Sequence, residues 1–242
     1  MSSQFENNQI NHSETSTVSR GALIVIEGLD RAGKSTQVKE LAKVIDGVAM
    51  RFPDRTTYIG EVINKYLKGV DHVDDHAIHL LFSANRWERL SRILDLINAG
   101  THVVVDRYSY SGAVYSAAKQ NPRLSLQWAW QPEVGLPKPD LCIFLDISPE
   151  AAAKRGGFGD EKYENNKMQQ EVRRLFNTLV RMPENDEMKV IDAGRPWEDV
   201  NMDVLAAAKN CISSIQGNLI LRKFGPLNTK GGDTSDPSKT FG

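Results

Sequence analysis

The chain has 242 residues, of which 40% are hydrophobic and 25% are charged, and these proportions fit one α/β domain. Lys and Arg total 30 against 31 Asp and Glu, a formal net charge of −1 that argues against non-specific coating of nucleic acid. The two cysteines are too few for a disulfide framework, and no paired zinc-ligand spacing occurs, which favours a reducing intracellular compartment. No apolar stretch is long enough to span a bilayer. We therefore expect no nucleic-acid partner and no membrane partner.

Both ends of the chain are polar and lack hydrophobic periodicity. Residues 1–19 are rich in Ser, Thr, Asn and Gln, and residues 224–242 are rich in Gly, Thr, Ser and Asp. Such segments cannot bury enough apolar surface to fold, so we expect two disordered tails around a domain at residues 20–223. Because residues 1–19 resemble neither a secretory signal nor a transit peptide, we expect a cytoplasmic protein that could also enter the nucleus.

Short apolar runs alternate with helical patterns along this domain. The runs are typical of buried parallel strands and cover residues 22–26, 102–105, 141–145 and, more weakly, 189–191. The helical patterns cover residues 35–45, 75–99 and 169–180. This alternation predicts an α/β fold, a doubly wound parallel sheet flanked by helices on both faces. In that architecture ligands bind beyond the carboxyl ends of the strands.

The first predicted strand leads directly into a glycine-rich loop. Residues 28–35, Gly-Leu-Asp-Arg-Ala-Gly-Lys-Ser, match the G-x-x-x-x-G-K-[ST] pattern and a helical pattern follows. The loop's backbone N–H groups can wrap a phosphate, Lys34 can reach the outer phosphates, and the Ser35 hydroxyl can bind Mg²⁺. The sequence therefore predicts a P-loop NTPase-type fold. A GTPase would need an N-K-x-D motif, and a motor would need a longer chain, so a kinase of small substrates is favoured.

Asp106 and Arg107 follow the second strong strand pattern. A carboxylate at that strand end can orient Mg²⁺ or its waters beside the phosphate loop, and a guanidinium can bind an acceptor phosphate in fork geometry. A helix N-cap followed by a solvated arginine would explain the same pair.

Two further groups lie on the predicted helix at residues 75–99. Phe82 and Arg86 are four residues apart and share a helix face, so they could stack on a flat base and bond its edge, although such an aromatic is also typical of a core. His72, His76 and His79 also have helical spacing, but a polar helix start explains them better than a metal site.

Several blocks in order resemble thymidylate kinases of the eukaryotic and poxvirus type, over residues 20 to about 194. The blocks that carry the resemblance are residues 28–36, 51–55 (Arg-Phe-Pro-Asp-Arg), 79–88, 106–112, 135–140 and 155–164. The resemblance implies phosphorylation of dTMP to dTDP with ATP and Mg²⁺, by direct in-line transfer, in dTTP biosynthesis. It also implies a short mobile lid at residues 155–164 and a homodimer.

The resemblance further implies roles in binding dTMP. Asp30 would hold the sugar 3′-hydroxyl, Arg55 and Arg107 would bind the phosphate, Phe82 would stack on thymine, and Arg86 would bond its edge. The other residues expected at the dTMP site are Phe52, Ser111, Gly112, Tyr115, Tyr163 and Gln169.

On the ATP side the resemblance implies that Arg31 contacts the transferring phosphate and that Arg155 stacks on adenine. The full set expected to bind ATP is Gly28, Asp30, Arg31, Ala32, Gly33, Lys34, Ser35, Thr36, Arg155 and Ala193. The expected catalytic residues are Arg31, Lys34, Asp106 and Arg107, and the expected Mg²⁺ ligands are Ser35 and Asp106.

Two other functions stay open at this point. A kinase of a nucleoside or of another monophosphate would share the phosphate loop, but a nucleoside acceptor would not require both Arg55 and Arg107. A nucleotide-dependent binding switch would share the loop and would not depend on dTMP.

Overall fold

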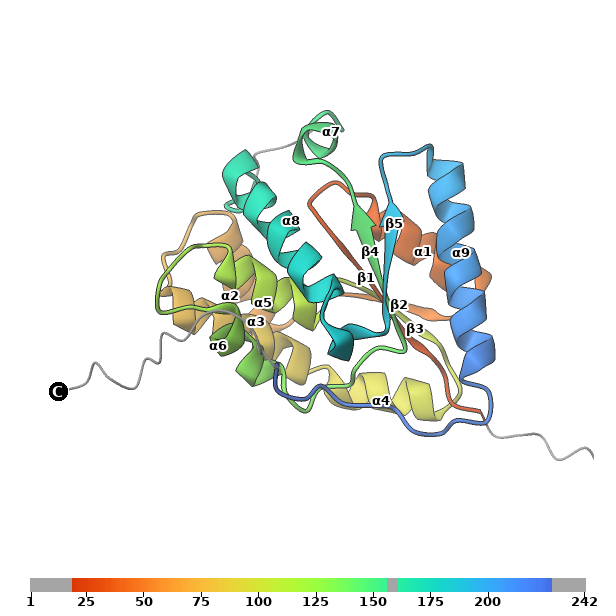
Figure 1. Cartoon of the computed structure of the whole chain (residues 1–242). Helices are drawn as coiled ribbons and strands as arrows, with labels where there is room; N and C mark the ends of the chain where they lie inside the picture. Colours follow the sequence, from red (N-terminus) through yellow and green to blue (C-terminus); the bar gives the residue numbers. More distant parts are fainter. Residues whose placement is uncertain (1–18, 156–160, 228–242) are drawn as a thin grey trace, which may run out of the picture.

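The computed structural model describes residues 19–155 and 161–227. Within these ranges, parallel strands form one sheet in the order β2-β3-β1-β4-β5. The strands are β1 (Leu23–Gly28), β2 (Val48–Arg51), β3 (Val103–Asp106), β4 (Leu141–Asp146) and β5 (Met188–Asp192). Helices α1 and α9 cover one face of the sheet, and α5 and α8 cover the other (Figure 1). The predicted α/β class and doubly wound parallel sheet are thereby confirmed.

The helices connect successive strands in the way that parallel pairing requires. They are α1 (Lys34–Val44), α2 (Tyr58–Leu67), α3 (Asp75–Trp87), α4 (Leu90–Asn98), α5 (Ser109–Ala117), α6 (Leu126–Trp130), α7 (Pro149–Ala153), α8 (Asn166–Val180) and α9 (Trp197–Ser214). Two short 3₁₀ helices, η1 (Gln131–Glu133) and η2 (Pro183–Asn185), follow α6 and α8. Several helices begin at a polar N-cap residue. The Thr57 side chain accepts from the Gly60 N–H at the start of α2, and the Asp74 side chain accepts from the His76 N–H at the start of α3.

Several elements differ from the sequence prediction, which did not include α2, α5, α6, α7 or α9. The predicted helix at residues 75–99 is two helices, α3 and α4, separated at Glu88 and Arg89, and Arg89 pairs with Asp54. Strand β2 was not predicted: its apolar run, Val48 to Met50, is short, and it lies at the sheet edge, where its residues alternate between partly buried and exposed. An edge strand of four residues leaves too weak a pattern to predict.

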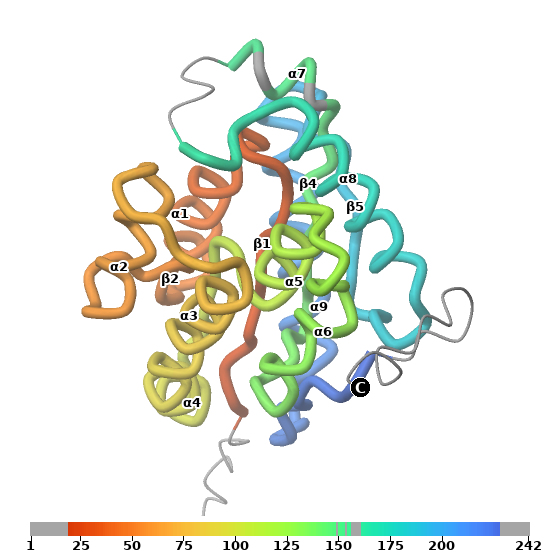
Figure 2. The backbone as a smooth tube through the Cα atoms, turned by 90° about the vertical axis from the view of Figure 1, so that its left-hand side faces the viewer, coloured from red at the N-terminus to blue at the C-terminus, as the bar shows by residue number. Residues whose placement is uncertain are grey.

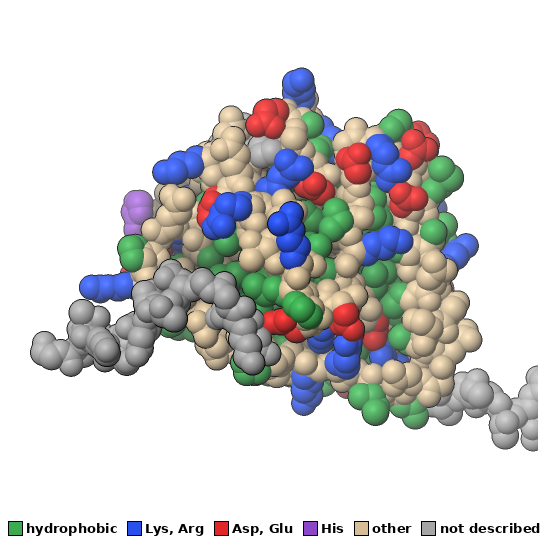
Figure 3. Space-filling view, in the orientation of Figure 1, with side chains coloured by type: hydrophobic (Ala, Val, Ile, Leu, Met, Phe, Trp, Pro, Cys, Tyr) green, Lys and Arg blue, Asp and Glu red, His purple; other side chains and the backbone are tan. Residues whose placement is uncertain are grey.

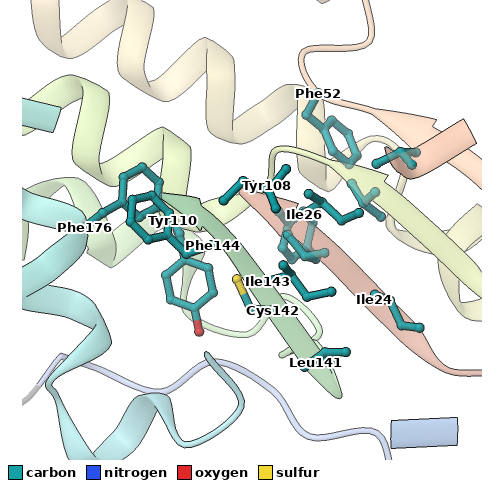
Figure 4. Packing of buried hydrophobic residues seen from close by; sticks show 14 of the residues in the cluster. Ile24, Ile26, Phe52, Tyr108, Tyr110, Leu141, Cys142, Ile143, Phe144 and Phe176 are labelled. Carbon is teal, nitrogen blue, oxygen red and sulfur yellow. The ribbon is translucent and has the colours of Figure 1, made fainter. Parts of the chain in front are cut away.

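The core lies between the sheet and the helices of both faces. Strand β1 is buried along its whole length, and Phe144 of β4 stacks on Phe176 of α8 with ring centroids 4.6 Å apart. Figure 4 shows these rings beside Tyr110 and Cys142, with Phe52 and Tyr108 on the other side of β1. This packing fixes the positions of the carboxyl ends of β1 and β3, after which the polar residues of the predicted site follow.

The carboxyl ends of β1 and β3 meet at the centre of the sheet. Ile26 pairs with Asp106, so the phosphate loop that follows β1 lies beside Asp106. Figure 2 shows α2 and α3 on one side of this end of β1, and α5 and α8 on the other. The strand order therefore brings the two predicted polar segments together, as expected for ligands in an α/β sheet.

The last described residues, 219–227, form a segment that runs back across the molecule and packs behind α5. Pro137 pairs with Lys223, the Phe224 ring lies 5.0 Å from that of Trp130 and 5.4 Å from that of Tyr110, and the Trp130 indole donates to the Gly225 carbonyl. Phe224 and Leu227 are buried, so packing continues past the expected boundary at residue 223. The predicted tails otherwise fall on residues 1–18 and 228–242, which lie outside the described residues.

On the face seen in Figure 3, acidic and basic side chains are interspersed and hydrophobic side chains show between them. In the two described ranges, no helix combines the length and the apolar character needed to cross a bilayer.

Candidate active site

The phosphate loop, residues 28–35, needs glycine at two positions for different reasons. Gly28 lies against the neighbouring strand β4, where a Cβ would come within 2.7 Å of the Leu145 carbonyl oxygen. Gly33 has φ = 93° at the N-terminus of α1, in the left-handed region that side chains disfavour. These two glycines let the loop turn tightly, and Ala32 lies between them. The loop leads into the start of α1, where free backbone N–H groups favour anions.

Lys34 is the buried cation of this loop. Its side chain is 6% exposed and its Nζ donates to the Leu29 carbonyl at 2.5 Å. Burial, with the nearby charge of Arg107, lowers the pKa of Lys34 to about 8. An anionic ligand at the loop would favour the charged amine.

Ser35 and Asp106 are joined as the strand order predicts. The Ser35 hydroxyl donates to Oδ2 of Asp106 at 2.5 Å, and Arg51 approaches the same carboxylate from the edge strand. The other oxygen, Oδ1, is buried without a hydrogen-bond partner. Since a buried lone carboxylate oxygen is costly, this one is available for a further ligand.

Asp30 and Arg107 form the centre of the site. Arg107, with φ = 65°, donates from Nη2 to Asp30 and from Nη1 to Ser111 and Tyr115, both at 3.2 Å. Burial alone would raise the pKa of Asp30, but the charges of Arg107 and Lys34 outweigh it, so the pKa is lowered. The Asp30 carboxylate therefore stays ionised at neutral pH.

A cavity opens on one side of this pair. Its lining contains ten of the eleven residues predicted for dTMP: Asp30, Phe52, Arg55, Phe82, Arg86, Arg107, Ser111, Gly112, Tyr115 and Tyr163. The eleventh, Gln169, lies outside the lining and binds Asp30 with its side-chain amide, at 2.8 Å. We call this the acceptor cavity. Its lining combines aromatic rings with arginines, as a nucleotide requires.

A second hollow, the phosphate cavity, lies on the loop side of the same pair. It is lined by Asp30, Arg31, Gly33, Lys34, Ser35, Thr36, Arg51, Arg107, Arg155 and Glu164. Arg155 reaches across it and donates to the carbonyls of Ala193 at 2.6 Å and Arg31 at 3.2 Å. The two cavities share Asp30, Arg51, Arg107 and Glu164, so the predicted ATP and dTMP residues meet at this wall.

Two predicted cations are held by carboxylates that sequence reasoning missed. Arg55 makes a bidentate pair with Glu161 at 2.7 and 3.0 Å, and Arg86 makes one with Glu133 at 2.7 and 2.6 Å. Glu161 belongs to the predicted lid, of which residues 156–160 lie outside the described residues. Because both partners are distant in sequence, no local pattern indicates them.

The histidines do not form a metal site. In the described part of the chain, no cluster of His, Cys, Asp and Glu is arranged to hold a metal ion. His76 contacts the Arg123 carbonyl at 2.9 Å, whereas His79 is fully buried.

Comparison with known proteins agrees with this geometry. The family model described as "Thymidylate kinase" matches residues 26–204. The chain belongs to the thymidylate kinase family. It is 46% identical to the zebrafish (Danio rerio) thymidylate kinase over 199 residues, covering 80% of this chain and 92% of the relative. It is 44% identical to the human thymidylate kinase over 198 residues, with the same coverage.

A solved structure of thymidylate kinase from Candida albicans superposes on this family member with a TM-score of 0.75 and 38% sequence identity. The match covers 79% of this chain and 92% of that chain.

The family implies Mg²⁺, and the side chains at the loop fit that ion. Magnesium prefers oxygen ligands and usually keeps several of its waters. Ser35 supplies a hydroxyl, and Asp106 supplies the unpaired oxygen Oδ1. Both lie where the phosphates of a nucleotide bound at the loop would approach.

Glu27 is a further residue of this kinase that sequence reasoning did not select. It is fully buried in β1, and one of its oxygens accepts the N–H groups of Tyr108 and Ser111 at 2.9 and 3.0 Å. The other oxygen accepts the Ser111 hydroxyl, which in turn accepts from Arg107. Burial raises the pKa of Glu27, against the effect of the Ser111 hydrogen bond and the Arg107 charge. The sequence signal that could have indicated Glu27 was a single carboxylate within an otherwise apolar strand.

We expect Glu27→Gln to raise KM for dTMP by roughly tenfold, because an unpaired buried hydrogen-bonding group costs about 1–3 kcal/mol. The glutamine oxygen must face the two backbone N–H groups, so its amino group faces Ser111 and reverses that hydrogen bond. The Ser111 proton then loses its buried acceptor beside Arg107. Steady-state kinetics of Glu27→Gln, Ser111→Ala and the double variant measure this effect. The double variant should be no worse than the worse single variant, whereas additive losses would contradict the relay.

Proposed function

We propose that this protein transfers the terminal phosphoryl group of ATP to dTMP, producing dTDP for dTTP biosynthesis. The observation that carries the proposal is the pair of cavities that meet at Asp30 and Arg107. One side has a phosphate loop, and the other has an aromatic slot that ends in arginines. Membership of the thymidylate kinase family supports the choice of substrate.

On the ATP side, we assign the phosphates to the loop backbone and to Lys34. Arg31 lines the same cavity and is assigned to the transferring group. Arg155, which bridges Arg31 and Ala193, is assigned to the adenine ring, with Ala193 beneath it. Mg²⁺ held by Ser35 and Asp106 would neutralise phosphate charge, so that positive groups surround the position of the migrating phosphoryl.

On the acceptor side, Arg55 and Arg107 are the groups that suit a phosphate. The Glu161 carboxylate that Arg55 holds in bidentate fashion is the kind of anion that a phosphate could replace. Asp30, ionised and oriented by Gln169, is assigned to the sugar 3′-hydroxyl. Phe82, Tyr115 and Tyr163 enclose the nucleoside, and Arg86 faces the base edge.

No covalent enzyme intermediate is required by this arrangement. The dTMP phosphate oxygen attacks the phosphoryl group directly, and the protein contributes positioning and charge. Closure of the predicted lid at residues 155–164 would exclude water and so suppress ATP hydrolysis.

The proposal is tested by ADP release with ATP and Mg²⁺, with and without dTMP. We expect turnover only when dTMP is present, and none for thymidine, which lacks the phosphate that Arg55 and Arg107 bind. Lys34→Ala is the matched control, since it removes the buried phosphate-loop cation and should lose most activity while remaining folded. ADP release independent of dTMP would favour a nucleotide switch, and phosphorylation of thymidine would favour a nucleoside kinase.

We further propose a homodimer, supported by the family and by exposed apolar side chains on α3, where Leu80 is 47% and Trp87 is 38% exposed. Light scattering measures the mass in solution. The absence of a nucleic-acid partner and the cytoplasmic or nuclear location stay predictions from the sequence.

A further inference from the structure

The loop that carries Arg55 is held through its backbone by one side chain of α3. Asn85 is fully buried, its Oδ1 accepts the Asp54 N–H at 2.7 Å, and its Nδ2 donates to the Asp54 carbonyl at 3.1 Å. A side-chain amide suits this task because it offers an acceptor and a donor together to the two backbone groups of one residue. The residue before Arg55 is therefore fixed to α3 at both its N–H and its carbonyl.

The same amide links the loop to the start of α2, which lies beside α3 (Figure 2). Nδ2 of Asn85 also donates to Thr57 Oγ1 at 3.1 Å and to Glu88 Oε1 at 2.6 Å. The Thr57 hydroxyl donates to that Glu88 oxygen at 2.7 Å, and Thr57 is the N-cap of α2. One helix, α3, consequently fixes both the loop and the helix start that follows it.

Gly60, in the first turn of α2, packs against the same stretch of backbone. A Cβ at this position would come within 1.8 Å of the Asp54 carbonyl oxygen and 2.8 Å of the Arg55 Cα. Only a glycine permits this approach, so α2 lies directly on the peptide that joins Asp54 to Arg55. The Asp54 carboxylate adds a further contact, because it accepts from Nε of Arg89 at 2.7 Å.

The guanidinium of Arg55 is held as well as its backbone. Nη1 donates to Oδ1 of Asn64, a residue of α2, at 3.0 Å, and the two Nη atoms pair with Glu161. Where a phosphate replaces this carboxylate, the Asn64 contact can remain. Ordering the backbone of even one residue on binding corresponds to a factor of roughly ten in affinity. An Arg55 that is already ordered avoids this loss.

We propose that Asn85 is a positioning residue for Arg55, and that it thereby sets the preference of the acceptor cavity for a nucleoside monophosphate over the nucleoside. The inference rests on the proposed dTMP function and deepens it. Helix α3 also carries Phe82 and Arg86, so it fixes the base-binding residues and the phosphate-binding loop relative to each other. A nucleoside has no phosphate and gains nothing from a fixed Arg55.

The nucleoside part of the cavity does not depend on Asn85. Phe52, at the start of the same loop, donates its N–H to the Asp106 carbonyl at 3.0 Å, and its ring lies 5.8 Å from that of Tyr108. These contacts anchor Phe52 to β3 and to the residues that follow it. Loss of Asn85 should therefore release Arg55 and leave the aromatic wall in place.

The test measures the dissociation constants of dTMP and thymidine for wild type, Asn85→Leu, Arg55→Ala and the double variant. Asn85→Leu should weaken dTMP by roughly tenfold, since the loop must then be ordered on binding. Thymidine should stay within about twofold of wild type, as for an uncoupled site. In Arg55→Ala, adding Asn85→Leu should cost no further dTMP affinity. Equal losses for both ligands, or an undiminished loss without Arg55, would overturn the positioning role. Failure of the dTMP function itself would appear separately, as equal binding of both ligands by wild type.

Two further variants separate positioning from a general loss of folding, which melting temperatures monitor. Gly60→Ala keeps every hydrogen-bonding group but displaces the peptide before Arg55, so we expect the same selective loss of dTMP. Ser83→Ala is the matched control, because it removes another buried hydrogen bond of α3, the one to the Pro132 carbonyl at 3.1 Å. It should leave the ratio of the two dissociation constants unchanged. Wild-type affinities in Gly60→Ala, or the selective loss in Ser83→Ala, would contradict the proposal.

Discussion

Replacing Arg31 with glycine is expected to lower kcat by roughly 10³-fold or more, within the range that an arginine acting on a transferring phosphoryl group supplies. Arg31 lies inside the phosphate loop and lines the phosphate cavity. In our proposal its charge acts where negative charge spreads in the transition state. The KM for dTMP should change little, because Arg31 is absent from the lining of the acceptor cavity.

Glycine is the informative substitution because of the backbone. Arg31 has φ = 65°, a conformation that glycine adopts more readily than arginine does. The variant should therefore keep its melting temperature, and a loss of kcat cannot be ascribed to unfolding. The measurement is kcat and KM determined separately, with thermal unfolding as control. If KM alone rose, Arg31 would be a ground-state binder.

The second large effect is the choice of base by the unmodified enzyme. Because Arg86 donates to the base edge in our proposal, dCMP should fall below dTMP in kcat/KM by roughly 10⁴-fold. The dUMP value should be lower than that of dTMP by roughly 10–200-fold, since the two bases differ by one methyl group. Steady-state kinetics with the three monophosphates measure this order, and comparable rates with dCMP and dTMP would contradict both the Arg86 role and the thymidylate assignment.

The ion pair between Arg86 and Glu133 determines which variant can support this test. Arg86→Ala leaves the Glu133 carboxylate buried and unpaired, which costs about 3–5 kcal/mol, so its activity loss would mix folding with recognition. Arg86→Met combined with Glu133→Leu removes both charges, and such replacements are often neutral for stability. We expect the double variant to remain folded and to lose the preference for dTMP over dCMP. A folded double variant with wild-type preference would refute the role of Arg86.

Local sequence predicted the elements whose signal is contiguous. The phosphate loop at residues 28–35 is one uninterrupted motif, and β1, β3 and β4 are apolar because both of their faces are buried. Strand β2 escaped prediction because its apolar run is short, as an edge position allows.

Contacts between distant residues could not be predicted from one sequence. The partners of Arg55 and Arg86, Glu161 and Glu133, lie 106 and 47 residues away along the chain. Nothing in the local pattern of a helix or lid indicates which carboxylate a given arginine will meet. The location of Asp106 beside Ser35, in contrast, followed from the rule that parallel strands end at one edge.

The segment at residues 219–227 affects the order in which the protein matures during synthesis. Phe224 packs against Tyr108 and Tyr110, at the start of the helix that walls the acceptor cavity. Because translation runs from the amino end, the phosphate loop and its strand leave the ribosome before the segment that backs the acceptor wall. A product of premature termination before Phe224 would thus carry a formed nucleotide loop and an unsupported acceptor half.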